Sequence, residues 1–257
     1  MFNVIERIRV PLQTLLDTIY PTICSECDTR IGPGEREGAG FFCAECWSRM
    51  DLLSEPHCPI CSVPFVSDIA LRYSPTHLCG ECRHKPPLFS SAITPFVYKG
   101  TMATAIKKLK YEKRVNLIGP LSALFLSSLA LALRLKSVQV DRILAIPLHP
   151  RRLRHREFNP SLLLAHRLAK GLAVPLEIDT LQRIRDTPPQ VGLSKEEREQ
   201  NVKGAFRVAT PDRITGQRLL LVDDVYTTGT TLREGAKVLR RAGATDVVVA
   251  TLARAVH

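Results

Sequence analysis

An apolar run, two adjacent acids and a threonine-rich turn constrain this chain more than any other feature of its sequence. Residues 219–222 read Leu-Leu-Leu-Val, a pattern that favours a central parallel strand covered on both faces. Asp223 and Asp224 follow at the carboxyl end of that strand, where open α/β sheets bind ligands. Residues 227–231 offer hydroxyls and backbone N–H groups at the start of a helix predicted over 232–241, which suits a phosphate. Paired carboxylates beside a phosphate site indicate a sugar phosphate, because vicinal hydroxyls can donate hydrogen bonds to the acids.

The run 219–231 resembles the phosphoribosyl pyrophosphate (PRPP) motif of type I phosphoribosyltransferases. The resemblance implies an α/β fold of that type, a parallel sheet flanked by helices. It also implies that PRPP binds with Mg²⁺, which would be chelated chiefly by PRPP oxygens and water. Asp223 and Asp224 are the expected catalytic residues, holding the two ribose hydroxyls. The residues expected to hold the 5-phosphate are Thr227, Thr228, Gly229, Thr230 and Thr231.

All eight cysteines of the 257-residue chain precede residue 83, in four Cys-x-x-Cys pairs. Two-residue spacing lets both thiolates of a pair bind one ion, and two pairs complete a closed tetrahedral site. A cytosolic protein does not keep disulfides, so the sequence predicts two structural Zn²⁺ sites, with redox-active dithiols as the alternative. Sequential pairing of the knuckles and an interleaved pairing of the first with the third both fit. The predicted metal ligands are Cys24, Cys27, Cys43, Cys46, Cys58, Cys61, Cys79 and Cys82.

The sequence predicts three parts along the chain. These are an N-terminal helix over 1–20, a double zinc-ribbon-like region over 21–85 and a phosphoribosyltransferase-like domain over 90–257, with a Lys-Pro-Pro linker at 85–87. Charged residues interrupt the N-terminus, so no secretory signal is apparent. The uncharged stretch 117–133 falls short of the roughly 20 residues that span a bilayer and is predicted to be a buried helix. We therefore expect a cytoplasmic protein without membrane insertion.

The net charge of +11 and the pI near 9.5 favour a polyanionic partner, such as nucleic acid or a polyphosphate metabolite. A basic surface that serves solubility alone is the alternative. A predicted helix over 102–111 carries several lysines, which form a solvated face, cover the phosphate site or contact nucleic acid. The loop after a predicted strand over 141–147 carries His149, Arg151 and Arg152. It is the expected second anion site, for the pyrophosphate that the resemblance requires.

Several local signals fix the remaining elements. Asn159 and Pro160 open a predicted helix that Gly171 is expected to end. Residues 181–185 read as an edge strand, and a polar segment then leads to Ser194 and Glu197, which form a capping box. The resemblance implies that this connection closes over PRPP and excludes water. The aromatic residues of the zinc region, Phe41, Phe42 and Trp47, are predicted to be ribbon core in preference to stacking platforms for bases.

Three further blocks resemble the ComF (competence protein F-like) family. They are the Pro-Leu-His-Pro of 147–150 with the arginines behind it, Phe158-Asn159 with the leucine-rich helix that follows, and 190–206, which includes Gln190, Leu193 and Phe206. The double zinc ribbon is also similar to the N-terminal extension of that family. The family usually carries Arg-Gly-Phe-Asn-Gln where this chain has Arg-Glu-Phe-Asn-Pro at 156–160, a departure that bears on any phosphate or DNA contact there.

The ComF resemblance implies a role in natural transformation, in which the protein handles incoming single-stranded DNA together with a helicase-like competence protein. Two other functions fit the same residues. One is an active phosphoribosyltransferase on an unknown base or amine in nucleotide metabolism. The other is a regulator that senses PRPP without turnover.

Overall fold

The computed structural model describes residues 21–32, 34–53, 56–65, 67, 69, 74, 76–188 and 194–256. The N-terminal helix predicted over 1–20 therefore lies outside the described residues. The same holds for Gln190 and Leu193 of the predicted closing segment.

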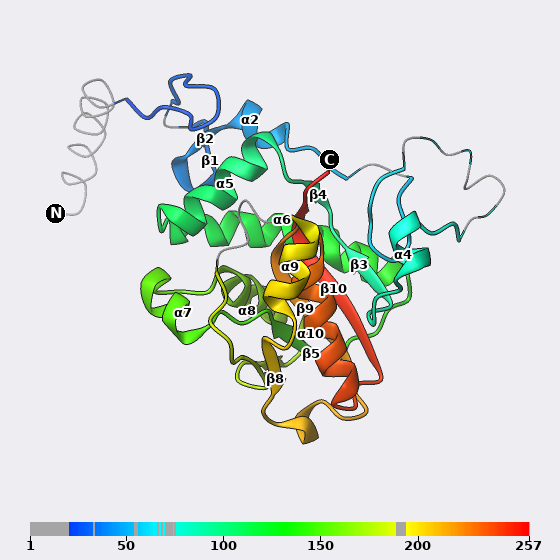
Figure 1. Cartoon of the computed structure of the whole chain (residues 1–257). Coiled ribbons are helices and arrows are strands. Elements are labelled where there is room, and N and C mark those ends of the chain that lie inside the picture. Colours follow the sequence, from blue (N-terminus) through cyan, green and yellow to red (C-terminus); the bar gives the residue numbers. More distant parts are fainter. Residues whose placement is uncertain are drawn as a thin grey trace.

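A parallel sheet with the order β3-β10-β9-β5-β6 forms the centre of the molecule, and β4 also pairs with β10 (Figure 1). β9 lies between β10 and β5, so residues 219–222 are buried on both faces, as their apolar run predicts. The strands are β3 (Ser91–Ile93), β4 (Phe96–Val97), β5 (Arg142–Ala145), β6 (Leu176–Glu177), β9 (Arg218–Tyr226) and β10 (Asp246–Arg254).

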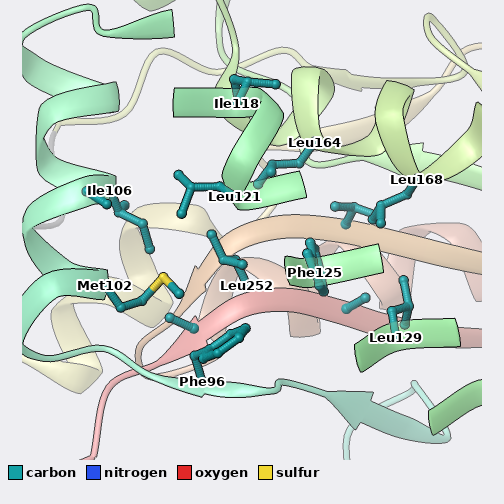
Figure 2. Packing of buried hydrophobic residues seen from close by; sticks show 14 of the residues in the cluster. Phe96, Met102, Ile106, Ile118, Leu121, Phe125, Leu129, Leu164, Leu168 and Leu252 are labelled. Atoms are coloured by element: carbon teal, nitrogen blue, oxygen red, sulfur yellow. The ribbon is translucent and has the colours of Figure 1, made fainter. Parts of the chain in front are cut away.

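Helices cover both faces of this sheet, and alternate residues of β9 supply the two cores. Leu220 and Val222 pack in the cluster that includes α5, α6 and α8, part of which Figure 2 shows, while Leu219 and Leu221 pack with α10. This architecture confirms the predicted α/β class. The helices are α5 (Gly100–Tyr111), α6 (Ile118–Leu135), α7 (Pro150–Arg156), α8 (Pro160–Leu172), α9 (Lys195–Val202) and α10 (Thr230–Arg241).

The apolar segment predicted as a buried helix forms α6, with Leu121, Phe125 and Leu129 fully buried against the sheet and α8 (Figure 2). Together with the preceding turn it spans Val115–Leu135, 21 residues, and is longer than its uncharged stretch suggests. By length and composition this one helix of the described chain could cross a membrane, with a mean hydropathy of 1.8, and 33% of its apolar window is buried inside the protein. A core helix of a soluble protein passes the same test.

Two local predictions were wrong in part. α8 continues through Gly171 to Leu172 and ends on Ala173, which adopts the left-handed conformation (φ 54°). Gly171 serves packing instead, because a Cβ there would lie 2.3 Å from a methyl of Leu126 in α6. The predicted edge strand is β7 (Leu181–Arg183), which pairs antiparallel with β8 (Phe206–Val208) in a separate two-stranded sheet. A short strand pattern gives the alternation of its side chains but not the strand with which it pairs.

The cysteine-rich region forms two small units that lie apart in Figure 1, one beside α5 and α6 and the other beside β3. Phe42 is fully buried with its ring centroid 5.6 Å from that of Trp47, and Phe41 packs partly buried against the same core, as predicted. The short elements here are β1 (Arg36–Glu37), the 3₁₀ turn η1 (Gly38–Gly40), β2 (Phe42–Cys43), α2 (Ala44–Ser48) and α4 (Gly80–His84).

Candidate functional site

Two helices bring polar side chains to the two adjacent acids in the last four residues of β9. Ser161, at the start of α8, donates a hydrogen bond from Oγ to Oδ1 of Asp223 at 2.7 Å. The backbone N–H of Asp224 donates to the same oxygen at 2.9 Å. Lys110, in the last turn of α5, places Nζ 2.6 Å from Oδ1 of Asp224, which is buried. The acids therefore have a serine and a lysine as partners in the absence of ligand.

Burial and neighbouring charges shift the pKa values of Asp223 and of Lys110, the partner of Asp224. Burial, and then the neighbouring carboxylate of Asp224, raise the pKa of Asp223 to about 7. Burial alone would lower the pKa of Lys110, but Asp224 outweighs it and the net shift is upward. Lys110 is therefore a cation at neutral pH. Asp223, which can exchange a proton near neutrality, thus lies beside the ion pair of Lys110 and Asp224.

The raised pKa of Asp223 predicts a pH dependence of stability. Between about pH 4 and pH 7 the folded protein binds a proton that the unfolded chain has already released, so stability falls as the pH rises through this window and then levels off. Asp223→Asn removes this titration. We expect its Tm relative to wild type to rise by roughly a few degrees from about pH 5.5 to about pH 7.5. Thermal unfolding of zinc-loaded protein measures this, and a constant difference in Tm would contradict it.

A tight turn links β9 to α10 and forms the predicted phosphate loop. Gly229 has a φ of +75°, and a Cβ there would lie 2.3 Å from the hydroxyl oxygen of Tyr226, so glycine is required by both conformation and space. No side-chain hydrogen bond caps α10 at Gly229 within the described residues. Thr228 and Thr230 place their hydroxyl oxygens 3.2 Å apart. The turn thus offers a helix start and clustered hydroxyls to an oxyanion.

The basic segment after β5, predicted as a loop, turns into helix α7 at Pro150. Asn159 holds the start of this segment in place, and the segment contacts the residues after β7. Asn159 donates from Nδ2 to the carbonyl of Ile146 at 2.9 Å. His149 caps α7, with Nδ1 accepting from the N–H of Arg151 at 3.4 Å, and Arg151 pairs with Asp186 at 3.2 Å. Asp186 also lies 3.4 Å from His149 Nδ1, so it joins this loop to the start of the predicted closing segment.

Arg183 in β7 is a site residue that sequence reasoning missed. Its side chain is buried; burial and the cation of Arg152 lower its pKa, and Asp223 opposes them, so Arg183 lies within electrostatic reach of both. Burial and then Arg156 lower the pKa of Arg152 in the same way. Confined cations of this kind favour an anionic ligand. The sequence signal for a buried Arg183 was its spacing from Leu181. Residues two positions apart in a strand lie on the same face, so Arg183 shares the face of the buried Leu181.

The eight cysteines gather sequentially into two groups of four. Within each group all sulfurs lie within 4.8 Å of one another, so the interleaved arrangement is not adopted. Sulfur separations of 3.9 Å for Cys27–Cys43 and 3.6 Å for Cys61–Cys79 fit a tetrahedron with bonds of about 2.3 Å, whose edges are about 3.8 Å. The two groups are Cys24, Cys27, Cys43, Cys46 (the first cysteine site) and Cys58, Cys61, Cys79, Cys82 (the second cysteine site).

The second Cys-x-x-Cys pair of each cysteine site has the same hydrogen-bond pattern at the start of a short helix. Cys43 and Cys79 each cap a short helix, and their sulfurs accept the N–H of Cys46 at 3.4 Å and Cys82 at 3.5 Å. Such contacts stabilise thiolates and aim both sulfurs of the knuckle at one point. Four sulfur ligands without an open position suit structural Zn²⁺, as the sequence predicts.

Comparison with known proteins gives two family matches, the double zinc ribbon domain over residues 15–83 and the phosphoribosyl transferase domain over residues 159–257. The DNA utilization protein YhgH of Shigella flexneri is 35% identical over 91% of this chain and 97% of that protein. Competence protein F of Haemophilus influenzae is 30% identical over 84% of this chain and 97% of that protein. Among solved structures, the glutamine PRPP amidotransferase of Bacillus subtilis is 24% identical over 56% of this chain and 30% of that chain, with a TM-score of 0.38.

Proposed function

Because this chain belongs to the ComF family, we propose that it binds Mg²⁺–PRPP at the acid pair and phosphate loop and serves the uptake of DNA. The observation that carries the proposal is the meeting of Asp223, Asp224 and the start of α10 at the carboxyl end of the central strand. The predicted parts over 21–85 and 90–257 are the proposed division between the zinc region and the domain that binds PRPP.

Each part of the site has a proposed role toward PRPP. Asp223 and Asp224 accept hydrogen bonds from the ribose hydroxyls, and residues 227–231 hold the 5-phosphate. His149 caps α7 and Arg151 and Arg152 lie in its first turn, the place proposed for the pyrophosphate. The carboxylates, hydroxyls and phosphates are the oxygen donors that Mg²⁺ prefers, and the ion would neutralise charge on the pyrophosphate. Lys110 must release or share Asp224 when a diol arrives.

Calorimetric titration of the zinc-loaded protein with Mg²⁺–PRPP tests this site. We expect saturable binding to one site per chain, with weaker binding of ribose 5-phosphate and of pyrophosphate, because each of these fills only part of it. Equal affinity for pyrophosphate and PRPP would show that the site binds anions in general and does not recognise the sugar. An absence of PRPP binding would contradict the proposal.

The DNA role rests on two relatives, a DNA utilization protein and a competence protein, and on the charge of the chain. The net charge is +11, and Tyr111 is 65% exposed with the guanidinium of Arg156 5.5 Å from its ring centroid. An exposed aromatic ring beside a cation is a platform on which a base of a single strand can stack. We propose that this surface handles single-stranded DNA in the cytoplasm beside a helicase-like competence protein.

Helix α7 also carries the exposed arginines Arg151 and Arg154 beside Arg156. Arg151→Glu with Arg154→Glu reverses their charge and should weaken single-stranded DNA binding by at least about tenfold at low salt. Wild-type affinity should fall steeply with salt, by about 0.7 ion for each phosphate neutralised, and the variant should show a shallower slope. Fluorescence anisotropy with a labelled oligonucleotide measures both. Arg30→Glu with Arg49→Glu reverses two exposed arginines of the zinc region and is the control for net charge. An equal loss in the two proteins would point to bulk charge instead of this surface.

Phosphoribosyl transfer is a second candidate, which the protonation of Asp223 favours. A carboxyl whose pKa is raised to about 7 can take a proton from an incoming base or amine near neutral pH. Release of pyrophosphate from PRPP in the presence of candidate acceptors, and its loss in Asp223→Asn, tests turnover. Tight binding without release would favour the PRPP-sensing regulator.

A further inference from the structure

The two cysteine sites have different surroundings. The first packs against the core of α5 and α6, and its Cys27 is exposed. The second lies in the core on the opposite face of the sheet, together with Tyr226 and residues of α10, and three of its four cysteines are buried. The second cysteine site therefore shares its core with the strand and helix that carry the phosphate loop.

Arg254 forms one connection between the second cysteine site and this loop. It is the last residue of β10 and is buried, and its guanidinium donates to the carbonyl of Cys61 at 2.6 Å. The same guanidinium lies 4.1 Å from the ring centroid of Tyr226, the last residue of β9. The hydroxyl of Tyr226 fills the space in which a side chain at Gly229 would lie. A continuous line of contacts thus runs from Cys61 through Arg254 and Tyr226 to Gly229.

Arg233 forms a second connection from the first turn of α10. Its guanidinium lies 3.9 Å from Sγ of Cys82, 3.3 Å from the carboxylate of Glu81 and 2.7 Å from the carbonyl of Lys85. Its backbone N–H donates to the carbonyl of Gly229 at 2.8 Å. The two arginines therefore reach the second cysteine site from the two elements that follow the phosphate loop in the chain.

The negative charge of a zinc-bound second cysteine site explains why two arginines lie beside it. Four thiolates around one Zn²⁺ keep a net negative charge, which a buried position stabilises only with cationic or donor partners around it. Arg233 and Arg254 supply such partners, and their geometry depends on the sulfurs and carbonyls that the metal fixes. We propose that these two arginines link the second cysteine site to the phosphate loop, so that bound Zn²⁺ positions Gly229 and the start of α10. The consequence for PRPP rests on the function proposed above.

Arg254→Met and Arg233→Met test this link in the full, zinc-loaded chain, with Arg49→Met beside the first cysteine site as the matched control. We expect two zinc ions per chain in all three. In Arg254→Met and Arg233→Met, amide hydrogen exchange over 226–233 should speed up by about tenfold and the Kd for Mg²⁺–PRPP should rise by about tenfold, as typical of partners around a metal site. Full zinc content with unchanged exchange and affinity in both variants would overturn the proposal.

A second comparison removes the metal sites one at a time. Cys58→Ser with Cys61→Ser should speed exchange over 226–233, while Cys24→Ser with Cys27→Ser should leave it within about twofold of wild type. Equal effects of the two pairs would overturn the link. Should the variant Cys58→Ser with Cys61→Ser fail to fold, the arginine variants still test the link between the second cysteine site and the phosphate loop. The exchange measurement needs no ligand, so it decides the link even if wild-type protein does not bind PRPP and the proposed function fails.

Discussion

Replacing both acids, Asp223→Asn with Asp224→Asn, is expected to weaken Mg²⁺–PRPP binding by more than about 100-fold. At the proposed site each carboxylate would accept a hydrogen bond from a ribose hydroxyl, and hydrogen bonds to charged groups contribute about 1.5–3 kcal/mol each. Their joint loss of about 3–6 kcal/mol corresponds to a factor of about 100 or more. The substitution also leaves Lys110 without its anionic partner, so its ammonium then faces two neutral amides.

Calorimetry measures the loss, and two controls keep it interpretable. Zinc content and cooperative thermal unfolding should persist, because the acids contact Ser161 and Lys110 and neither cysteine site. Asp212→Asn, an exposed acid in the turn before β9, should bind PRPP like wild type. Undiminished PRPP binding in the double variant would place the sugar phosphate elsewhere on the molecule.

Gly229→Ala should disable the phosphate loop, whereas Gly216→Ala should not. The two glycines have nearly equal φ angles, +75° and +74°, so both substitutions place a Cβ in the left-handed region at a cost of about 1–2 kcal/mol. Only at Gly229 does the new Cβ meet another group, the hydroxyl of Tyr226 at 2.3 Å; at Gly216 nothing lies within 4 Å. The difference between the variants therefore isolates the steric conflict.

We expect Gly229→Ala to lower PRPP affinity by at least about tenfold, because the loop must move away from the buried Tyr226 ring. Gly216→Ala should lower Tm by a few degrees and leave affinity unchanged. Combining Gly229→Ala with Tyr226→Phe should restore little affinity, because two ring carbons that phenylalanine keeps lie 2.4 and 2.6 Å from the new Cβ. Equal affinities of the two alanine variants would show that the fit around Gly229 does not matter to the ligand.

The parts of the fold that local sequence determines were predicted well. The apolar run 219–222 forms the central strand, Ser194 and Glu197 form the predicted capping box, and Asn159 caps α8. These features depend on residues within a few positions of one another, so their spacing is sufficient to identify them. The four cysteine pairs were equally plain, because ligand spacing within a knuckle is also local.

Contacts between distant segments could not be predicted in the same way. The pairing of Lys110 with Asp224 joins residues 114 positions apart, and Arg254 reaches Cys61 across 193 positions. The sequential arrangement of the cysteine pairs, the partner of β7 and the packing role of Gly171 also depend on which surfaces meet in the folded chain. The local sequence pattern around each of these residues would be the same with a different partner, so the pattern cannot identify the partner.

The contact between Lys110 and Asp224 means that the site is never without a cation. A ligand that takes the carboxylate must displace the ammonium, which is buried enough that it cannot simply turn to water and needs a new anion nearby. Mg²⁺–PRPP would bring a diol for the acid and a pyrophosphate that can receive the lysine, whereas ribose 5-phosphate brings the diol and its 5-phosphate but no pyrophosphate. At the proposed site the resident lysine would thus compete with the ligand for the carboxylate, and a ligand that carries both a diol and a pyrophosphate would displace the lysine more readily than ribose 5-phosphate would.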